Sequence, residues 1–283
     1  MKKHLFCGVN LLGDGLCTTP TLEALKRDLS IRGEKINIVY ITQDQQISRF
    51  LENNPYVDRV IYEKDEPKIR SMKGWGNFSK KHLFNVSEAY SIGCRSGMHM
   101  AEAYAHLYGV KIASSRPIVN VTKNDRENAK KYLPEGKYIC VSPHSVSSSM
   151  EDKEDRAGNK LWGDSKWKKM FLFLQEARYE VISLGAENDP RYNVDGLIEL
   201  HGLPIKTVAA ILEQSSYFVT IDNGLAHLGA AVNAKIVEIY PQALPLTWVV
   251  PHVSHRRILY GYPPNIPVDA VIKAFEDLRN EIE

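Results

Sequence analysis

The chain has 283 residues, of which 43% are hydrophobic, and this length and composition suit two folded domains. It contains no run of about 18 apolar residues, which argues against a membrane-spanning helix. Its basic amino-terminal tip leads into a Gly-Asp-Gly stretch instead of a small-residue cleavage site, so we interpret it as a core strand and not as a signal peptide. Four cysteines without paired or metal-ligand spacing favour a reduced, cytoplasmic setting.

Charge is distributed unevenly, although the net charge is only +2. Residues 1–134 contain 21 Lys and Arg against 14 Asp and Glu, a balance of +7, whereas residues 135–283 contain 15 against 20, a balance of −5. A basic half predicts an acidic partner for that half. The alternative is a solvated surface whose charges have no partner.

Strand and helix patterns alternate along the first half of the chain. The predicted elements are strands at Leu5–Leu12, Ile36–Thr42 and Val57–Tyr62, and helices at Thr21–Leu29, Gln45–Asn53, His99–Leu107 and Lys123–Tyr132. Residues 63–81 are polar and basic and indicate a long loop. Pro134-Glu135-Gly136 is the best candidate for a domain boundary.

A second alternating set follows this boundary. Its predicted elements are strands at Tyr138–Ser142, Glu180–Leu184, Phe218–Ile221 and Lys235–Tyr240, and helices at Trp167–Ala177, Thr207–Gln214, Leu225–Ala231 and Val268–Glu281, with residues 241–267 irregular. The fold class predicted is α/β, with two facing Rossmann-like domains, residues 1–134 and 135–283, and a cleft between them. We expect the terminal helix to pack back on the first domain. Ligands in such folds bind at the carboxyl ends of the strands.

The segment Tyr217–Tyr240 predicts an anion site. A buried strand stops at Asp222-Asn223-Gly224 and a helix of small residues follows, so backbone N–H groups and the positive helix end point towards the turn. His227 lies one turn into that helix. The structural alternative is that Asp222 is only an N-cap, Gly224 only a turn residue and His227 a satisfied histidine, and this turn alone leaves both interpretations open.

Asp14 lies between Gly13 and Gly15 after the first predicted strand. The glycines permit a close backbone approach, and a carboxylate at a strand end can accept a proton from a hydroxyl nucleophile. The spacing does not match the GxGxxG fingerprint, so dinucleotide binding is poorly supported. Asp14 as a turn-capping residue is the structural alternative.

Two further loops of the second half carry candidate ligand-binding residues. Ser145 lies in a hydroxyl-rich loop after a strand, and Lys160 follows an acidic stretch and precedes Trp162, a set that suits phosphate oxygens. Glu187 follows the strand that ends near Leu184, where a carboxylate can accept hydrogen bonds from ribose hydroxyls. A surface glutamate is an equally good interpretation of Glu187.

The basic loop of the first half suits the phosphates of an acceptor. Its cations, which surround Trp75 and Phe78, are Lys64, Lys68, Arg70, Lys73, Lys80 and Lys81. Basic residues interleaved with aromatic residues also suit single-stranded nucleic acid. A solvated loop without a partner is the third interpretation.

Taken in order, these motifs resemble the heptosyltransferases of glycosyltransferase family nine. The matching segments are Gly13-Asp14 with Thr19-Pro20, the stretch Asn54–Ile61, Lys160-Leu161-Trp162, Gly185-Ala186-Glu187 and Asp222–His227. The resemblance implies a GT-B fold and an inverting, metal-independent transfer of a sugar from a nucleotide diphosphate, typically ADP-heptose, without a cofactor. It covers nearly the whole chain.

The resemblance also implies roles for individual residues. Asp14 would be the base on the acceptor hydroxyl, while Lys160 and the turn at Asn223-Gly224 would stabilise the departing diphosphate. The remaining donor-binding residues would be Ser145, Trp162, Glu187, Asp222 and His227. Asn223 stands where the family usually has Ser or Thr, so an amide must substitute for a hydroxyl donor, and Gly163 replaces the proline of a family motif. These departures leave the donor sugar and the acceptor open.

The leading hypothesis is therefore a monomeric, inverting glycosyltransferase that acts on an acidic acceptor such as the lipopolysaccharide inner core, with peripheral membrane contact left open. The same chemistry on another acceptor, such as a modified base in DNA, is a second hypothesis, because the basic loop suits a phosphate backbone. A third is a nucleotide-sugar-binding protein of the same fold that has lost turnover.

Overall fold

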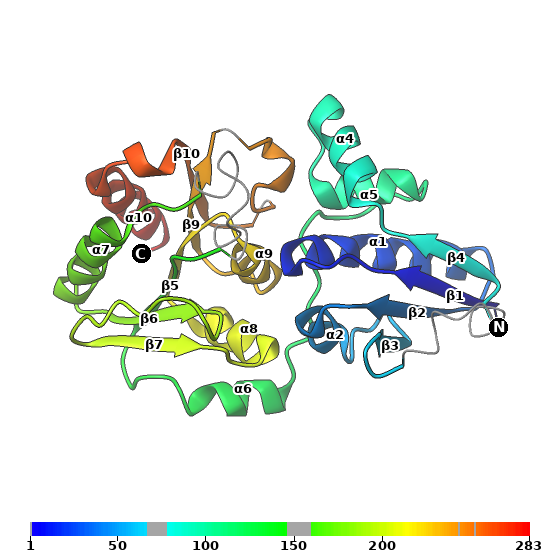
Figure 1. Ribbon diagram of the computed structural model, residues 1–283, viewed down its shortest axis with the longest axis horizontal. Coiled ribbons are helices and arrows are strands. Elements are labelled where there is room, and N and C mark those ends of the chain that lie inside the picture. Colours follow the sequence, from blue (N-terminus) through cyan, green and yellow to red (C-terminus); the bar gives the residue numbers. More distant parts are fainter. Residues whose placement is uncertain (1, 67–77, 146–159, 243, 252) are drawn as a thin grey trace. The chain divides into compact units, whose positions relative to one another are not determined.

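A computed structural model of the protein describes residues 2–66, 78–145, 160–242, 244–251 and 253–283 (Figure 1). It divides into two compact α/β units, each built on one parallel sheet. Unit 1 comprises residues 1–120 and 246–251, and unit 2 comprises residues 121–245 and 252–283. The α/β class with two parallel sheets, as predicted from the sequence, is confirmed. We describe each unit by itself.

Unit 1 contains a four-stranded sheet with the strand order β3-β2-β1-β4. Its strands are β1 (Lys2–Cys7), β2 (Ile36–Thr42), β3 (Arg59–Tyr62) and β4 (Lys80–Leu83), and its helices are α1 (Leu12–Ile31), α2 (Gln45–Leu51), α4 (Val86–Ser96) and α5 (Met100–Leu107). The chain order reverses at β1, because β2 and β3 lie to one side of it and β4 to the other. Residues at the carboxyl end of β1 therefore occupy a topological switch point, where ligands of open α/β sheets bind.

Unit 2 contains a six-stranded sheet with the order β10-β9-β8-β5-β6-β7. Its strands are β5 (Tyr138–Ser142), β6 (Glu180–Gly185), β7 (Leu197–His201), β8 (Tyr217–Ile221), β9 (Ile236–Pro241) and β10 (Arg256–Gly261). Its helices are α6 (Lys123–Lys130), α7 (Asp164–Glu176), α8 (Ile205–Gln214), α9 (Gly224–Ala231) and α10 (Val268–Ile282). The switch point lies between β5 and β8, since the two halves of the sheet grow outward from this pair.

Helices cover both faces of the six-stranded sheet. Figure 1 shows α7 and α10 on one side of it and α8 and α9 on the other. Ile139 and Val141 of β5 face the core that α7 and α10 close, where Trp167, Phe171 and Phe275 are buried. Strands buried on both faces read as continuous apolar runs, which is why β5 and β8 were predicted from their sequence.

The first strand is shorter than the sequence predicts. We expected it to reach Leu12, but β1 ends at Cys7 and α1 already begins at Leu12. The Gly-Asp-Gly stretch is therefore the first turn of a helix and not a loop at a strand end. Glycine lowers the stability of a helix by only about 1 kcal/mol relative to alanine, so two glycines do not exclude a helix and are a poor sign of a turn. The strands β4, β7 and β10 and the helix α4 were also not foreseen.

The helix α1 continues through Pro20, which lacks the N–H that would bond the carbonyl of Leu16. The Thr19 hydroxyl donates to that carbonyl at 2.7 Å and accepts from the backbone N–H of Ile118 at 2.8 Å. The neighbouring Thr18 hydroxyl donates to the Gly15 carbonyl at 2.7 Å. The Thr19 hydroxyl thus replaces the missing backbone donor, and the helix extends to Ile31.

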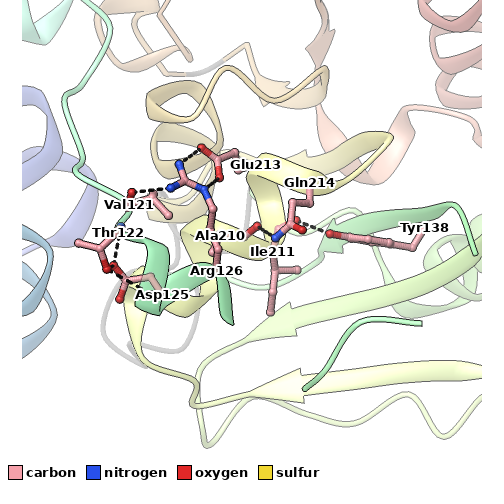
Figure 2. Close-up of polar contacts among 9 residues, drawn as sticks. All are labelled: Val121, Thr122, Asp125, Arg126, Tyr138, Ala210, Ile211, Glu213 and Gln214. Atoms are coloured by element: carbon pink, nitrogen blue, oxygen red, sulfur yellow. Dashed lines mark hydrogen bonds and ion pairs between the residues drawn. The ribbon is translucent and has the colours of Figure 1, made fainter. Parts of the chain in front are cut away.

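The boundary between the units lies at residues 120 and 121, earlier than the expected position at 134 and 135. The cause is α6, which follows the boundary and packs on α8 of the same unit. Arg126 of α6 donates two hydrogen bonds to the Glu213 carboxylate, at 2.6 and 2.7 Å, and a third to the Val121 carbonyl, at 3.0 Å. Figure 2 shows these contacts. Thr122 and Asp125 form a capping box that begins α6.

Replacement of Arg126 by alanine should lower the free energy of unfolding by about 1 kcal/mol, since a bidentate pair at a partly exposed site contributes roughly that much. Thermal unfolding of the variant measures the loss. Glu213→Gln should give a similar decrease, and the double variant no more than the larger of the two. Additive losses would show that the two side chains do not act as a pair.

The terminal helix α10 packs on β9, β10 and α7 of unit 2. A different segment of the second half belongs to unit 1, namely residues 246–251. There Trp248 stacks on Tyr90 of α4, with ring centroids 4.5 Å apart, and a Cβ at Gly93 would overlap the side chain of Thr247. The return of the chain to unit 1 is therefore made by this short segment, which the sequence indicated only as irregular.

Candidate active site

Asp14 lies in the first turn of α1, at the switch point of the four-stranded sheet. The partial positive charge at a helix amino terminus stabilises a carboxylate in this position. Its negative charge is one of the causes that raise the pKa of Cys17 and the pKa of Tyr104, after burial, which is the largest cause for both. Asp14 is thus a half-buried carboxylate at the edge of a cluster of poorly ionising groups.

The two glycines beside Asp14 were predicted to permit a close backbone approach. Gly15 is buried, and a Cβ there would come within 2.7 Å of the Ile47 side chain, so its small size lets α1 approach α2. Gly13 is partly exposed in the same turn. A glycine that the sequence analysis missed, Gly8, follows β1, and a Cβ there would overlap the Tyr40 ring. Close packing within unit 1 accounts for Gly8 and Gly15.

The turn between β8 and α9 is built on two side chains with different partners. Asn223, and not Asp222, is the N-cap of α9, because its Oδ1 accepts from the Ala226 N–H at 2.9 Å. Asp222 instead forms an ion pair with Lys160, with Nζ and Oδ2 2.6 Å apart and the two side chains 17% and 6% exposed. The structural alternative for Asp222, a simple N-cap, is therefore wrong. His227, farther along α9, is buried.

The Asn223 amide also fixes the loop that follows β5. Its Nδ2 donates to the Ser142 hydroxyl at 2.9 Å and to the His144 carbonyl at 2.9 Å. Ser145 is the next residue of this loop and is partly exposed. Lys160, the β8–α9 turn and the loop after β5 therefore meet at the switch point of the six-stranded sheet, where ligands of such folds bind.

Glu187 lies beyond the carboxyl end of β6, exposed, with its carboxylate directly over Gly202. A Cβ at Gly202 would overlap that carboxylate, and the φ of Gly202 is +71°, a left-handed conformation that favours glycine. Gly202 follows β7, so the two neighbouring strand ends together set the place of Glu187. The sequence indicated Glu187 but gave no sign that Gly202 determines its position.

Gly202→Ala should displace the Glu187 carboxylate and strain the backbone by about 1 kcal/mol. If Glu187 holds the ribose, the dissociation constant of ADP should rise about as much in Gly202→Ala as in Glu187→Ala, measured by calorimetry. Gly196→Ala is the matched control, since it has a similar φ of +73° but lies beside Gln175 and not beside Glu187. Unchanged ADP affinity in Gly202→Ala would contradict the role of Glu187.

Several predicted site residues lie elsewhere or outside the described residues. Trp162 is 1% exposed, donates its indole N–H to the Ile266 carbonyl at 2.8 Å and packs edge-on against Trp167, so it is a core residue. Lys64 is exposed after β3, and Lys80 and Lys81 are exposed on the edge strand β4. Phe78 packs against the core of unit 1. Outside the described residues lie Lys68, Arg70, Lys73 and Trp75.

The sequence analysis missed three aromatic residues near the carboxyl ends of β5, β6 and β7. His144 stacks on Tyr192, with ring centroids 5.4 Å apart, and the backbone N–H of Tyr192 donates to the Glu199 carboxylate at 2.8 Å. His201 is buried, and neither ring nitrogen has a hydrogen-bond partner among the described residues. Burial, followed by the positive charge of Arg191, lowers the pKa of His201. No pattern in the sequence indicated His201, because the strand β7 that it ends was not predicted.

Two doubly wound parallel sheets with polar side chains at their switch points define the class of Rossmann-like α/β proteins that bind ligands at strand ends. The model of glycosyltransferase family 9 (heptosyltransferase) matches residues 68–261, which is more than half of the chain. The chain therefore belongs to glycosyltransferase family 9, and it is a glycosyltransferase with the GT-B fold.

Solved structures share the fold over almost the whole chain. ADP-heptose lipopolysaccharide heptosyltransferase II of Escherichia coli matches with a TM-score of 0.75 and 16% identity, covering 99% of each chain. A family 9 glycosyltransferase of Veillonella parvula matches with a TM-score of 0.74 and 16% identity, covering 99% of this chain and 97% of that one. The iron-containing dodecameric glycosyltransferase TibC of enterotoxigenic E. coli matches with a TM-score of 0.69 and 14% identity, covering 100% of this chain and 77% of that one. No curated protein matches the sequence.

Two further expectations can be compared with the structure. No helix in the described parts of the chain combines the length and the apolar composition that crossing a bilayer demands. None of the four cysteines, all of which lie in the described parts of the chain, forms a disulfide. The expectation of a monomer stays a prediction, and light scattering of the purified chain measures it.

Proposed function

We propose that the protein is an inverting glycosyltransferase that moves a sugar from a nucleotide diphosphate sugar, ADP-heptose or a close analogue, to an acidic acceptor such as the lipopolysaccharide inner core. The observation that carries this proposal is the ion pair of the half-buried Lys160 with the buried Asp222 beside the amino terminus of α9, at the switch point of the six-stranded sheet. This arrangement offers a cation and a positive helix end to a diphosphate.

Asp14 is the proposed base of the reaction. Its carboxylate accepts the proton of the acceptor hydroxyl while the hydroxyl oxygen forms a bond to the anomeric carbon from the face opposite the leaving group. The bond between that carbon and the phosphate oxygen breaks, and the nucleoside diphosphate leaves with the electron pair. One displacement inverts the anomeric centre. The positive helix end at the first turn of α1 lies beside the Asp14 carboxylate that is proposed to accept the proton.

Lys160 and the start of α9 are proposed to stabilise the departing diphosphate. An ammonium carries three donors, of which Asp222 accepts one, and we propose that the others bind phosphate oxygens. Negative charge grows on the diphosphate as the bond breaks, and fixed donors that meet this charge lower the barrier. Ser145 and His227 are proposed to line the same donor site, with Glu187 on the ribose.

The proposed reaction uses no metal ion, and this part is a prediction, since TibC is iron-containing. Transfer of heptose from ADP-heptose should be unchanged within a factor of two after treatment with a strong chelator followed by desalting. Metal analysis of the protein before treatment completes the measurement. Loss of transfer that returns on addition of a metal would contradict metal independence.

A thermal-shift series with nucleoside diphosphates and their sugars tests the donor. A ligand that binds only the folded chain raises the melting temperature by an amount that follows its affinity. We expect ADP and ADP-heptose to raise it and UDP and UDP-glucose to leave it unchanged. If none of the four compounds raises the melting temperature, the proposed function is overturned.

The acceptor is tested by transfer assays with heptose-deficient lipopolysaccharide and with duplex DNA. Lys64, Lys80 and Lys81 are exposed in unit 1 and are proposed to contact acceptor phosphates. We expect transfer to the lipopolysaccharide. Transfer to DNA with a steep dependence on salt concentration would replace that acceptor by a nucleic acid, because phosphate contacts release counterions.

A further inference from the structure

Both N–H donors of the Asn223 side chain are engaged in hydrogen bonds. A carboxamide has two N–H donors and one carbonyl acceptor. The Nδ2 donors bond the Ser142 hydroxyl and the His144 carbonyl, each at 2.9 Å, and Oδ1 accepts from the Ala226 N–H at 2.9 Å. The opposite orientation of the amide would place its oxygen against the His144 carbonyl and its nitrogen against the Ala226 N–H, so the network itself fixes the orientation.

These three bonds join the two elements that flank the switch point. Ser142 is the last residue of β5, and His144 belongs to the loop that follows it. Ala226 lies in the first turn of α9, which follows β8. The strands β5 and β8 are neighbours, so one amide links the carboxyl ends of both. With both N–H groups engaged, Asn223 has none to offer a phosphate in this arrangement.

The link extends to the next loop of the sheet. Asn223 holds the backbone of His144, whose ring stacks on Tyr192, and the Glu199 carboxylate accepts from the backbone N–H of Tyr192. Asp222, the residue before Asn223, holds Lys160. Consecutive residues of one turn thus fix the loop that carries Ser145 and the proposed phosphate lysine.

We infer that Asn223 is a positioning residue for donor binding: its amide ties the loop after β5 to the start of α9, and the phosphates are bound by its neighbours and not by its own side chain. This inference rests on the proposed function and refines it. A serine or threonine could cap α9 through its hydroxyl, but its one oxygen replaces two separate amide atoms, and an oxygen placed for the cap is not at the Nδ2 position from which Asn223 bonds Ser142 and His144. The inference therefore predicts that a residue usual in the family fails in this chain.

The test compares Asn223→Thr, Asn223→Ala and Ser142→Ala with the wild-type chain. Thr keeps the cap and loses the link, so we expect the dissociation constant of ADP to rise about tenfold in Asn223→Thr and Asn223→Ala alike, the equivalent of about 1.4 kcal/mol. The KM for ADP-heptose should rise in proportion, with kcat within about threefold of wild type, because the chemistry at Asp14 is untouched. ADP binding at wild-type strength in Asn223→Thr would overturn the inference.

A double-mutant cycle separates positioning from direct contact. If Asn223 acts through Ser142, the variant with both changed to alanine should bind ADP no more weakly than Asn223→Ala alone. Losses that multiply would show an independent contact with the ligand and would overturn the inference. Asn85→Ala is the matched control, since Asn85 caps α4 in unit 1 through the same kind of bond. It should lower the melting temperature slightly and leave ADP binding unchanged.

Hydrogen exchange without any nucleotide distinguishes this inference from the proposed function. The amides of His144 and Ser145 should exchange at least tenfold faster in Asn223→Thr than in wild type. Unchanged exchange would overturn the positioning role, whatever happens to ADP. If Asn223→Thr exchanges faster but the wild-type chain binds no nucleotide, the role of Asn223 in holding the loop is supported and only the proposed function is overturned.

Discussion

Asp14→Asn should lower the kcat for heptose transfer about a thousandfold and leave the dissociation constant of ADP within a factor of two. An amide has the shape of the carboxylate but cannot accept the acceptor proton, and a positioned base contributes about 10² to 10⁴ in rate. ADP affinity should persist because Asp14 belongs to unit 1, whereas the proposed phosphate-binding residues belong to unit 2. Single-turnover transfer assays and calorimetry measure the two quantities.

The control for this variant is Asp28→Asn, which removes a carboxylate from the same helix at a position beside Arg27. Its transfer rate should equal that of wild type. Asp14→Asn should also lower the melting temperature slightly, since a negative charge in the first helical turn contributes about 0.3 to 1 kcal/mol. Wild-type turnover in Asp14→Asn would show that another group takes the proton.

Lys160→Met should lower the free energy of unfolding by about 3 kcal/mol and abolish measurable ADP binding. The methionine leaves the Asp222 carboxylate buried without its partner, and an uncompensated buried charge is strongly destabilising. It also removes the cation proposed for the phosphates. Denaturant unfolding measures the first effect and calorimetry the second.

The variant Lys160→Met with Asp222→Asn separates these two effects. The neutral pair should recover most of the lost stability, because no charge is left without a partner, but it should bind ADP as weakly as Lys160→Met alone. Recovery of ADP binding in the double variant would show that Lys160 serves only to neutralise Asp222. Stability that is not recovered would show that the packing of the lysine stem matters more than its charge.

Strand patterns were predicted best where a strand is buried on both faces. The bounds of β2 and β5 agree with the predicted strands at Ile36–Thr42 and Tyr138–Ser142, since only a long apolar run can fill the middle of a parallel sheet. The strands β4 and β10 are edge strands, with exposed or half-buried residues, and carry no such pattern. Edge strands form because a neighbour offers hydrogen bonds, which the sequence of one segment does not reveal.

The sequence indicated individual residues of the site but not the contacts between them. Asp222, Asn223 and Lys160 were indicated because each follows or precedes a recognisable element, yet their pairing was not. That Asp222 holds Lys160, and that Asn223 holds Ser142 and His144, depends on the neighbouring positions of β5 and β8 in the sheet. Trp162 was predicted as a donor-site residue because of its motif, but the bond to Ile266, 104 residues away in the chain, places it in the core.

The sequence by itself determined the α/β class, the strand ends that carry polar residues and the resemblance to family 9, because apolar periodicity and short motifs are local properties of a chain. The tertiary structure decided which side chains are partners. It placed Asp14 in a helical turn, assigned α6 to unit 2 through Arg126 and Glu213, and showed that the Asn223 amide has no donor left for a ligand. Hydrogen bonds between distant residues depend on strand order, and strand order is a property of the whole fold.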